Sequence, residues 1–173
     1  MARLPNKFGG GSQTNRNGLA FEQTTSLDSA LKEIGYSIRD CKVFDKETII
    51  GFSVPQNKVY SVFLEKKGVN YKDYNSKKWR PDECFINMQN RVAYIIEKKF
   101  QNTPGSVDEK LPSCHFKRQE YQKLFAPLHF KVEFLYVFND WFLDKRYRDT
   151  LDYIEQMGCS YYFNEIPLDF LGL

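Results

Sequence analysis

The sequence lacks the features that would assign it to several familiar protein classes. No uninterrupted apolar run approaches the roughly 18 residues of a membrane span, and the segment 1–5 has no apolar run typical of a signal peptide. The four cysteines are scattered without a Cys-x-x-Cys pair, and there are only two histidines. These absences argue against a zinc ribbon, a disulfide framework and a histidine-rich metal site. We expect a cytoplasmic protein with no membrane partner.

The 173 residues do contain enough apolar material for one compact domain. Hydrophobic residues make up 42% and charged residues 27%, which is typical of a globular chain rather than a disordered one. Aromatic residues reach 16%, and this content favours a sheet-rich interior. We expect a flexible arm, rich in glycine and amide side chains, over residues 1–18 and a single domain over residues 19–173.

Basic residues are concentrated in two segments of a chain whose formal net charge is only +3. Residues 1–21 carry three basic side chains and no acidic one, and residues 57–80 carry seven basic side chains against Glu65 and Asp73. Clustered basic segments of this kind favour a nucleic-acid partner. Candidate contacts to nucleic acid are Asn15, Arg16 and Asn17 in the arm, and Lys77, Lys78 and Arg80 in the second segment.

Both segments also have an ordinary structural interpretation. The arm is equally typical of a disordered terminus. The Tyr71–Arg80 part of the second segment can form a solvated loop, or it can hold phosphates through Lys77, Lys78 and Arg80 while Trp79 stacks on a base. The position of this segment directly before Asp82 favours the second interpretation.

Hydrophobic periodicity predicts an α/β layer domain with a mixed sheet. Val92–Ile96 and Lys131–Phe138 are apolar on both faces, as expected of central strands. Pro55-Gln56-Asn57, between two β-rich runs, predicts a hairpin. The predicted helices span residues 19–34, 113–125 and 143–157, and the predicted strands span 48–54, 58–64, 83–88, 92–99, 131–138 and 160–163.

Polar side chains line up at the end of one of these buried strands. Because side chains alternate along a strand, Glu97, Lys99 and Gln101 project from one face. Lys98 projects from the other face and is expected to be solvated or to snorkel to water. Placing three polar groups there is costly unless water, a metal or a ligand meets them. A hairpin around residues 89–91 would bring Asp82 close to Glu97, and two carboxylates make an oxygen-rich site that suits Mg²⁺. The structural alternative is that Asp82 caps a strand end and Glu97 forms a surface ion pair.

The pattern Pro81-Asp82…Glu97-Lys98-Lys99 resembles the PD-(D/E)XK signature of the restriction-endonuclease-like nuclease superfamily. This resemblance implies a restriction-endonuclease-like core, in which a mixed central sheet of about five strands is flanked by helices on both faces. It implies that Asp82 and Glu97 bind Mg²⁺, for which Mn²⁺ can substitute, and that Lys99 is the catalytic lysine.

The resemblance also implies weaker catalytic assignments and a function. Glu22 matches a further acidic residue in the first helix, and Gln101 matches a polar extension after the lysine. Asn17–Glu22 and Gly105–Leu111 look like segments of type II restriction endonucleases, so the likeness covers most of the chain from residue 15. The expected function is therefore a Mg²⁺-dependent, sequence-specific endonuclease that cuts double-stranded DNA as a homodimer.

Two other functions remain open at this point. One is a viral or mobile-element nuclease that recognises DNA structure or nicks DNA with little sequence preference. The other is a non-catalytic DNA-binding module on the same fold. The intact set of Asp82, Glu97 and Lys99 speaks against the second.

Overall fold

Two strands with no polar face form the centre of the molecule. In the computed structural model, which describes Phe21 and residues 24–173, β5 (Val92–Lys99) and β6 (Lys131–Phe138) lie side by side in parallel. The residues from Ala93 to Glu97 and from Phe134 to Phe138 are buried without interruption. This burial on both faces is why the sequence shows no alternation there. Both predicted strands are confirmed.

In the part of the chain that the structure describes, seven strands form the sheet in chain order. The four successive pairs from the first strand to β5 are antiparallel, whereas β6 and the last strand run parallel to β5. The mixed α/β class is confirmed, but with seven strands instead of about five, because two strands of three and four residues are too short to show alternation. The remaining strands are β1 (Ser37–Arg39), β2 (Lys42–Asp45), β3 (Thr48–Ser53), β4 (Glu83–Asn87) and β7 (Ser160–Phe163).

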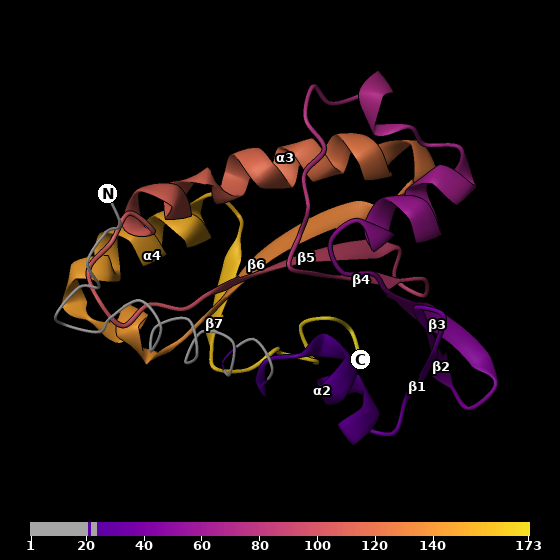
Figure 1. Cartoon of the computed structure of the whole chain (residues 1–173), viewed down its shortest axis with the longest axis horizontal. Coiled ribbons are helices and arrows are strands. Elements are labelled where there is room, and N and C mark those ends of the chain that lie inside the picture. The colour runs from indigo at the N-terminus through magenta and orange to yellow at the C-terminus, as the bar shows by residue number, and fades with distance from the viewer. Residues whose placement is uncertain (1–20, 22–23) are drawn as a thin grey trace, which may run out of the picture.

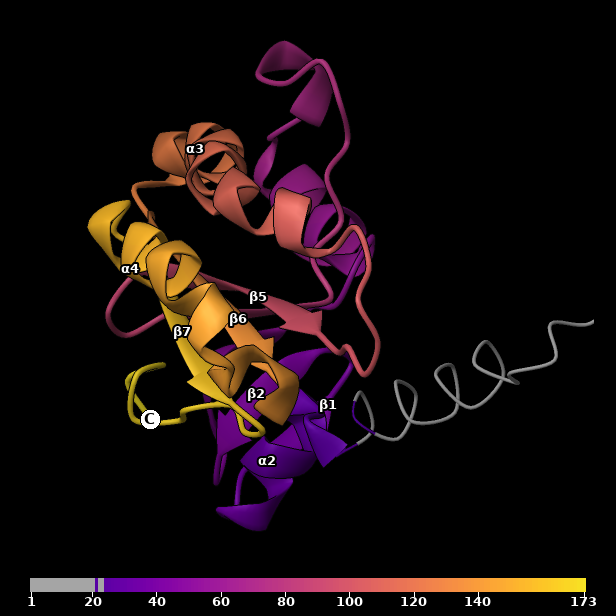
Figure 2. The same cartoon turned by 90° about the vertical axis from the view of Figure 1, so that its left-hand side faces the viewer.

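Helices cover both faces of the sheet (Figures 1 and 2). On one face lie α3 (Cys114–Phe125) and α4 (Arg148–Gln156), and on the other lie α2 (Leu27–Glu33) and the C-terminal segment. The core is divided accordingly into two buried clusters, one on each side of the sheet. Among the described residues, no helix combines the length and the apolar character that crossing a membrane requires.

The helix boundaries differ from the predicted ones for local reasons. The predicted helix 19–34 contains α2, which begins at Leu27 because the Ser26 hydroxyl accepts a hydrogen bond from the Ser29 N–H at 3.4 Å. Residues 19, 20, 22 and 23 of that prediction lie outside the described residues. The predicted helix 113–125 is confirmed, with a 3₁₀ segment over Asp108–Ser113 before it. The predicted helix 143–157 is shorter, because residues 140–147 form two 3₁₀ turns.

The predicted hairpin between residues 48–54 and 58–64 is wrong in its second half. Val59–Leu64 forms a π-helical segment instead of a strand. Its buried residues Val59, Tyr60, Phe63 and Leu64 are spaced as one face of a helix, and their branched and aromatic side chains imitate strand composition. The chain after β3 is held by backbone hydrogen bonds, from the Gln56 N–H to the Pro81 carbonyl at 2.9 Å among others.

Gly51 allows β3 to approach β4 closely, which yields a test of the packing. A Cβ at this position would lie 2.5 Å from the Ile86 carbonyl oxygen and 2.9 Å from the Phe85 ring. We expect Gly51→Ala to lower the free energy of unfolding by about 1–3 kcal/mol through overpacking, as measured by urea denaturation. Gly105→Ala is the control, since its Cβ would make only an ordinary contact at 3.5 Å. Equal stability of the two variants would contradict the close approach.

Candidate active site

The register between β4 and β5 brings the two predicted carboxylates together. Glu83 pairs with Ile96 in this antiparallel ladder, so the preceding residue, Asp82, comes level with Glu97. The Lys98 backbone N–H donates a hydrogen bond to Asp82 Oδ2 at 2.7 Å. The backbone of β5 therefore fixes the carboxylate that β4 contributes, and the predicted strand pair around residues 89–91 is confirmed.

Lys99 lies between these carboxylates. Its Nζ is 3.0 Å from Glu97 Oε2 and 3.7 Å from Asp82 Oδ2. The side chain of Glu97 is only 6% exposed, whereas that of Asp82 is 42% exposed. The structure thus brings together the three predicted site residues, in a cluster that is closed on the Glu97 side and open to solvent on the Asp82 side.

Helix α3 adds a second ammonium group that sequence reasoning missed. Lys117 Nζ is 3.3 Å from Glu97 Oε2, and its side chain is 20% exposed. The helix was predicted, and Lys117 falls on the same stripe as the buried residues Cys114, Tyr121 and Leu124. A lysine on an otherwise apolar stripe is the signal that could have found it.

Tyr121 lies one helical turn after Lys117 and is almost fully buried. Burial is the main cause that raises the pKa of Tyr121, and the carboxylates of Glu97 and Asp82 raise it further. Its hydroxyl therefore stays protonated at neutral pH. Tyr121 can act as a neutral polar group near the site but not as a base.

Gln101 is held by a different set of partners. Its backbone N–H donates to Asn139 Oδ1 at 3.1 Å, and its side-chain amide donates to the Thr103 carbonyl at 2.8 Å. The other side-chain atom, Gln101 Oε1, is buried with no hydrogen-bond partner among the described residues. None of its described hydrogen bonds reaches the three clustered side chains, so its catalytic role stays a prediction.

Lys98 is not solvated, contrary to expectation. Its Nζ lies 2.9 Å from Glu83 Oε1, and the two side chains are 6% and 13% exposed. The face of the sheet on which they lie carries the second core cluster, which includes Ile96. Alternation along β5 thus separates a structural ion pair on one face from the candidate site on the other.

In the second basic segment, residues 57–80, some side chains already contact other parts of the protein. The Trp79 indole N–H donates to Glu120 Oε2 at 3.3 Å, and its ring contacts Phe116 edge-on. Lys78 lies 3.6 Å from Glu65 Oε1. These contacts weigh against Trp79 as a base-stacking platform. Arg80 and Lys77 are exposed, and nucleic-acid contacts by Lys77, Lys78 and Arg80 stay a prediction.

Four of the predicted site residues lie outside the residues that the structure describes. They are Glu22, Asn15, Arg16 and Asn17.

The donor set fits a magnesium ion in its chemistry. Asp82 and Glu97 offer carboxylate oxygens, which are the ligands that Mg²⁺ prefers in proteins. Within residue 21 and residues 24–173, no group of three or more histidine, cysteine or acidic side chains could hold a metal. Two carboxylates would leave coordination positions for water and for phosphate oxygens, as is usual for Mg²⁺ in phosphoryl-transfer sites.

The chain is similar to a known protein family. A family model described as a PD-(D/E)XK nuclease superfamily domain matches residues 13–126, which is more than half of the chain. The matched range contains Asp82, Glu97, Lys99 and Lys117. No curated protein and no solved structure matches the chain.

The buried ion pair on the far side of β5 can be tested through stability. We expect Glu83→Gln to lower the free energy of unfolding by about 1–3 kcal/mol, because the Lys98 ammonium loses a buried carboxylate partner. Adding Lys98→Met should recover part of that loss. The control is Asp149→Asn, whose pair with Arg148 is largely exposed and should contribute nothing measurable. Urea denaturation of all three proteins measures the effect, and a Glu83→Gln variant as stable as the control would refute it.

Proposed function

Because this chain belongs to the PD-(D/E)XK nuclease superfamily, we propose that it is a Mg²⁺-dependent endonuclease that cuts double-stranded DNA. The observation that carries the proposal is the position of the Lys99 ammonium, which lies within 4 Å of carboxylate oxygens from both Asp82 and Glu97. Family membership supports nuclease activity in general. The metal, the DNA substrate and sequence specificity of the type II restriction class are our proposal.

Asp82 and Glu97 are the residues that would hold the metal, either Mg²⁺ or Mn²⁺. When bound, such an ion neutralises charge on the scissile phosphate and makes a bound water more acidic. The Lys98 backbone N–H holds Asp82 in place for this role. Lys99 can donate a hydrogen bond to the attacking water and stabilise negative charge that develops on the phosphate oxygens. Tyr121 remains neutral and adds no negative charge to the site.

Lys117 acts in this proposal as a positioning residue. Lys117 contacts Glu97 from α3, whereas Lys99 contacts it from β5, the strand that also carries Glu97. Two ammonium groups thus hold one nearly buried carboxylate. Their positive charge offsets the cost of burying the Glu97 carboxylate. The same positive charge repels a cation. The two ammonium groups therefore hold the Glu97 carboxylate in place but lower the affinity of the site for a metal ion.

The proposed partner and assembly follow from the restriction assignment. A two-fold symmetric dimer matches a palindromic duplex site, and we propose that the enzyme acts as a homodimer in the cytoplasm. Lys77, Lys78 and Arg80 adjoin Asp82 in the chain and are proposed to contact phosphates, together with Asn15, Arg16 and Asn17. Glu22 and Gln101 are proposed to support the catalytic group.

Digestion of plasmid DNA with Mg²⁺ tests the proposed activity. We expect Asp82→Ala and Lys99→Ala each to lower the cleavage rate by at least about 100-fold, because each removes a group that acts on the scissile phosphate. DNA binding should largely survive. The Asp149→Asn variant, which changes an exposed carboxylate far along the chain, should cut like the parent. Full activity in both alanine variants would show that this cluster is not the active site.

The pattern of products separates the forms of the proposal. Discrete fragments indicate sequence-specific cutting. Smeared products, nicks or cutting confined to junctions indicate the structure-specific alternative, and DNA binding without any cutting indicates a non-catalytic module.

The role of Lys117 predicts that its removal increases metal affinity, which damage to the fold would not do. We expect Lys117→Met to bind Mn²⁺ about 3- to 10-fold more tightly than the parent, because one of two ammonium groups next to Glu97 is gone. Calorimetry on the DNA-free protein measures this. Lys123→Met, on the same helix but paired with Glu120, is the control and should leave affinity unchanged. Unchanged or weaker binding in Lys117→Met would contradict the positioning role.

A further inference from the structure

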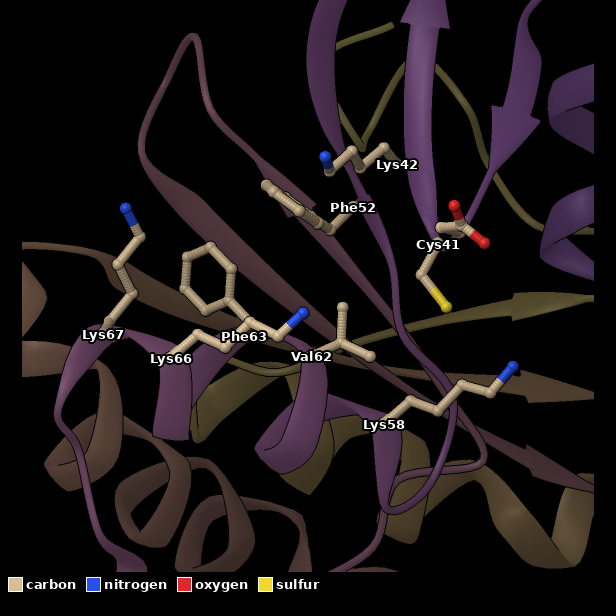
Figure 3. A pocket seen from close by; sticks show the side chains of 9 residues that line it. Cys41, Lys42, Phe52, Lys58, Val62, Phe63, Lys66 and Lys67 are labelled. Atoms are coloured by element: carbon tan, nitrogen blue, oxygen red, sulfur yellow. The ribbon is translucent and has the colours of Figure 1, made fainter.

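A hollow of about 730 Å³ lies between the sheet and the helical segments that follow β3 (Figure 3). One wall comes from the β1–β2 turn and from β3, and the other from the π-helical segment and the residues on either side of it. We call this region the basic cleft. It is lined by Asp40, Cys41, Lys42, Phe52, Lys58, Val62, Phe63, Lys66 and Lys67.

A tight turn builds the sheet side of the basic cleft. Asp40 and Cys41 both have positive φ, at 51° and 64°, and join β1 to β2 as a two-residue loop. Two positive φ values in succession define the turn type that matches the twist of paired strands. The Cys41 carbonyl accepts a hydrogen bond from the Ser53 N–H at 2.9 Å, so this turn is fixed against the end of β3.

The charge of the basic cleft is strongly one-sided. Four of its lining residues are exposed lysines, against a single aspartate. Figure 3 shows that Lys42 approaches from the sheet side, whereas Lys58, Lys66 and Lys67 come from the helical side. Among the ion pairs of the described residues, none involves any of these four ammonium groups. Unpaired lysines around a concavity attract a polyanion.

The floor of the basic cleft is apolar. Phe52 and Phe63 pack edge to face with ring centroids 5.2 Å apart, and Phe52 and Val62 are partly exposed. The lysines on the rim suit the regularly repeated phosphates of a nucleic-acid backbone, and the apolar floor suits the sugars between those phosphates.

Backbone hydrogen bonds join one end of the basic cleft to the strand that leads into the candidate active site. Gln56 donates its N–H to the carbonyl of Pro81, the residue directly before Asp82. Lys58, on the rim of the basic cleft, follows Gln56 by two residues. Val54 in turn donates to the Cys84 carbonyl at 2.8 Å. A short, hydrogen-bonded stretch of backbone thus connects the two sites.

We propose that the basic cleft binds the phosphodiester backbone of the nucleic-acid substrate beyond the scissile phosphate. This inference rests on the proposed nuclease function and adds a binding site to it. The four lysines hold successive phosphates of a strand whose cleaved bond lies at Asp82, Glu97 and Lys99.

Paired substitutions test the charge. We expect Lys58→Gln/Lys66→Gln and Lys42→Gln/Lys67→Gln each to weaken binding to a fluorescent DNA duplex by about 5- to 20-fold, and to reduce the slope of log K against log salt concentration by about 1 to 2. Fluorescence anisotropy in EDTA measures binding without cleavage. All four side chains are exposed, so the variants should fold.

Two controls make the charge test specific. Lys32→Gln/Lys46→Gln removes the same charge from exposed positions outside the basic cleft, and should leave both the affinity and the salt slope near the parent values. Lys58→Arg/Lys66→Arg keeps the charge and should retain the parent affinity. Equal losses in the cleft pairs and in the Lys32/Lys46 pair would overturn the proposal.

Cys41 gives a positional test, since it lies in the basic cleft and is partly exposed, while Cys84, Cys114 and Cys159 are buried. We expect saturating DNA to slow alkylation of Cys41 by iodoacetamide at least about fivefold, because a bound strand covers the thiol. An unchanged rate at saturating DNA would overturn the proposal.

The two readouts separate failure of this inference from failure of the proposed function. Loss of cleavage in Asp82→Ala, together with parent-like binding in both cleft pairs, would refute only the basic cleft. Full cleavage in Asp82→Ala and Lys99→Ala, together with weak binding in the cleft pairs and protection of Cys41, would refute only the catalytic assignment.

Discussion

The candidate site depends on one feature of the backbone, the antiparallel register between β4 and β5. A shift by one residue would turn Asp82 to the opposite face from Glu97 and separate the two carboxylates. The register is held by five residue pairs and by buried side chains on both faces, Phe85 and Ile95 among them. Beyond the last of these pairs, the Lys98 N–H donates a hydrogen bond to the side-chain carboxylate of Asp82. The chemistry of the site is therefore secured by the sheet itself.

Charge balance explains how a nearly buried carboxylate is tolerated. Glu97 contacts two ammonium groups, from Lys99 and Lys117, and with Asp82 the cluster has equal numbers of positive and negative charges. On the opposite face of the same strand, Lys98 and Glu83 form a closed pair. The two charged groups differ in solvent exposure. The side chains of Lys98 and Glu83 are almost buried, whereas the exposed side chain of Asp82 makes the candidate site accessible to water and to ligands.

The sequence allowed prediction of those parts of the fold and site whose signal is local. The apolar runs of β5 and β6 are unambiguous, and the spacing from Asp82 to Glu97 and Lys99 needs only a hairpin to become a cluster. β1 and β2 are too short to show alternation, and Val59–Leu64 has strand-like composition but is helical because its buried face packs on the core. The position of Lys117 on an apolar helix stripe marks it as unusual, but its contact with Glu97 and the pairing of Lys98 with Glu83 depend on tertiary packing.

The connection between β5 and α3 has a consequence for how such a site can diverge. Glu97, Lys99 and Lys117 come from one strand–helix unit, joined by a segment that is exposed from Thr103 to Ser106. Lengthening or shortening this tether would shift the helix, and with it the Lys117 ammonium, while every residue of the sheet stayed the same. Loop length alone could therefore retune the electrostatics of the carboxylates during evolution, without a single substitution among Asp82, Glu97 and Lys99.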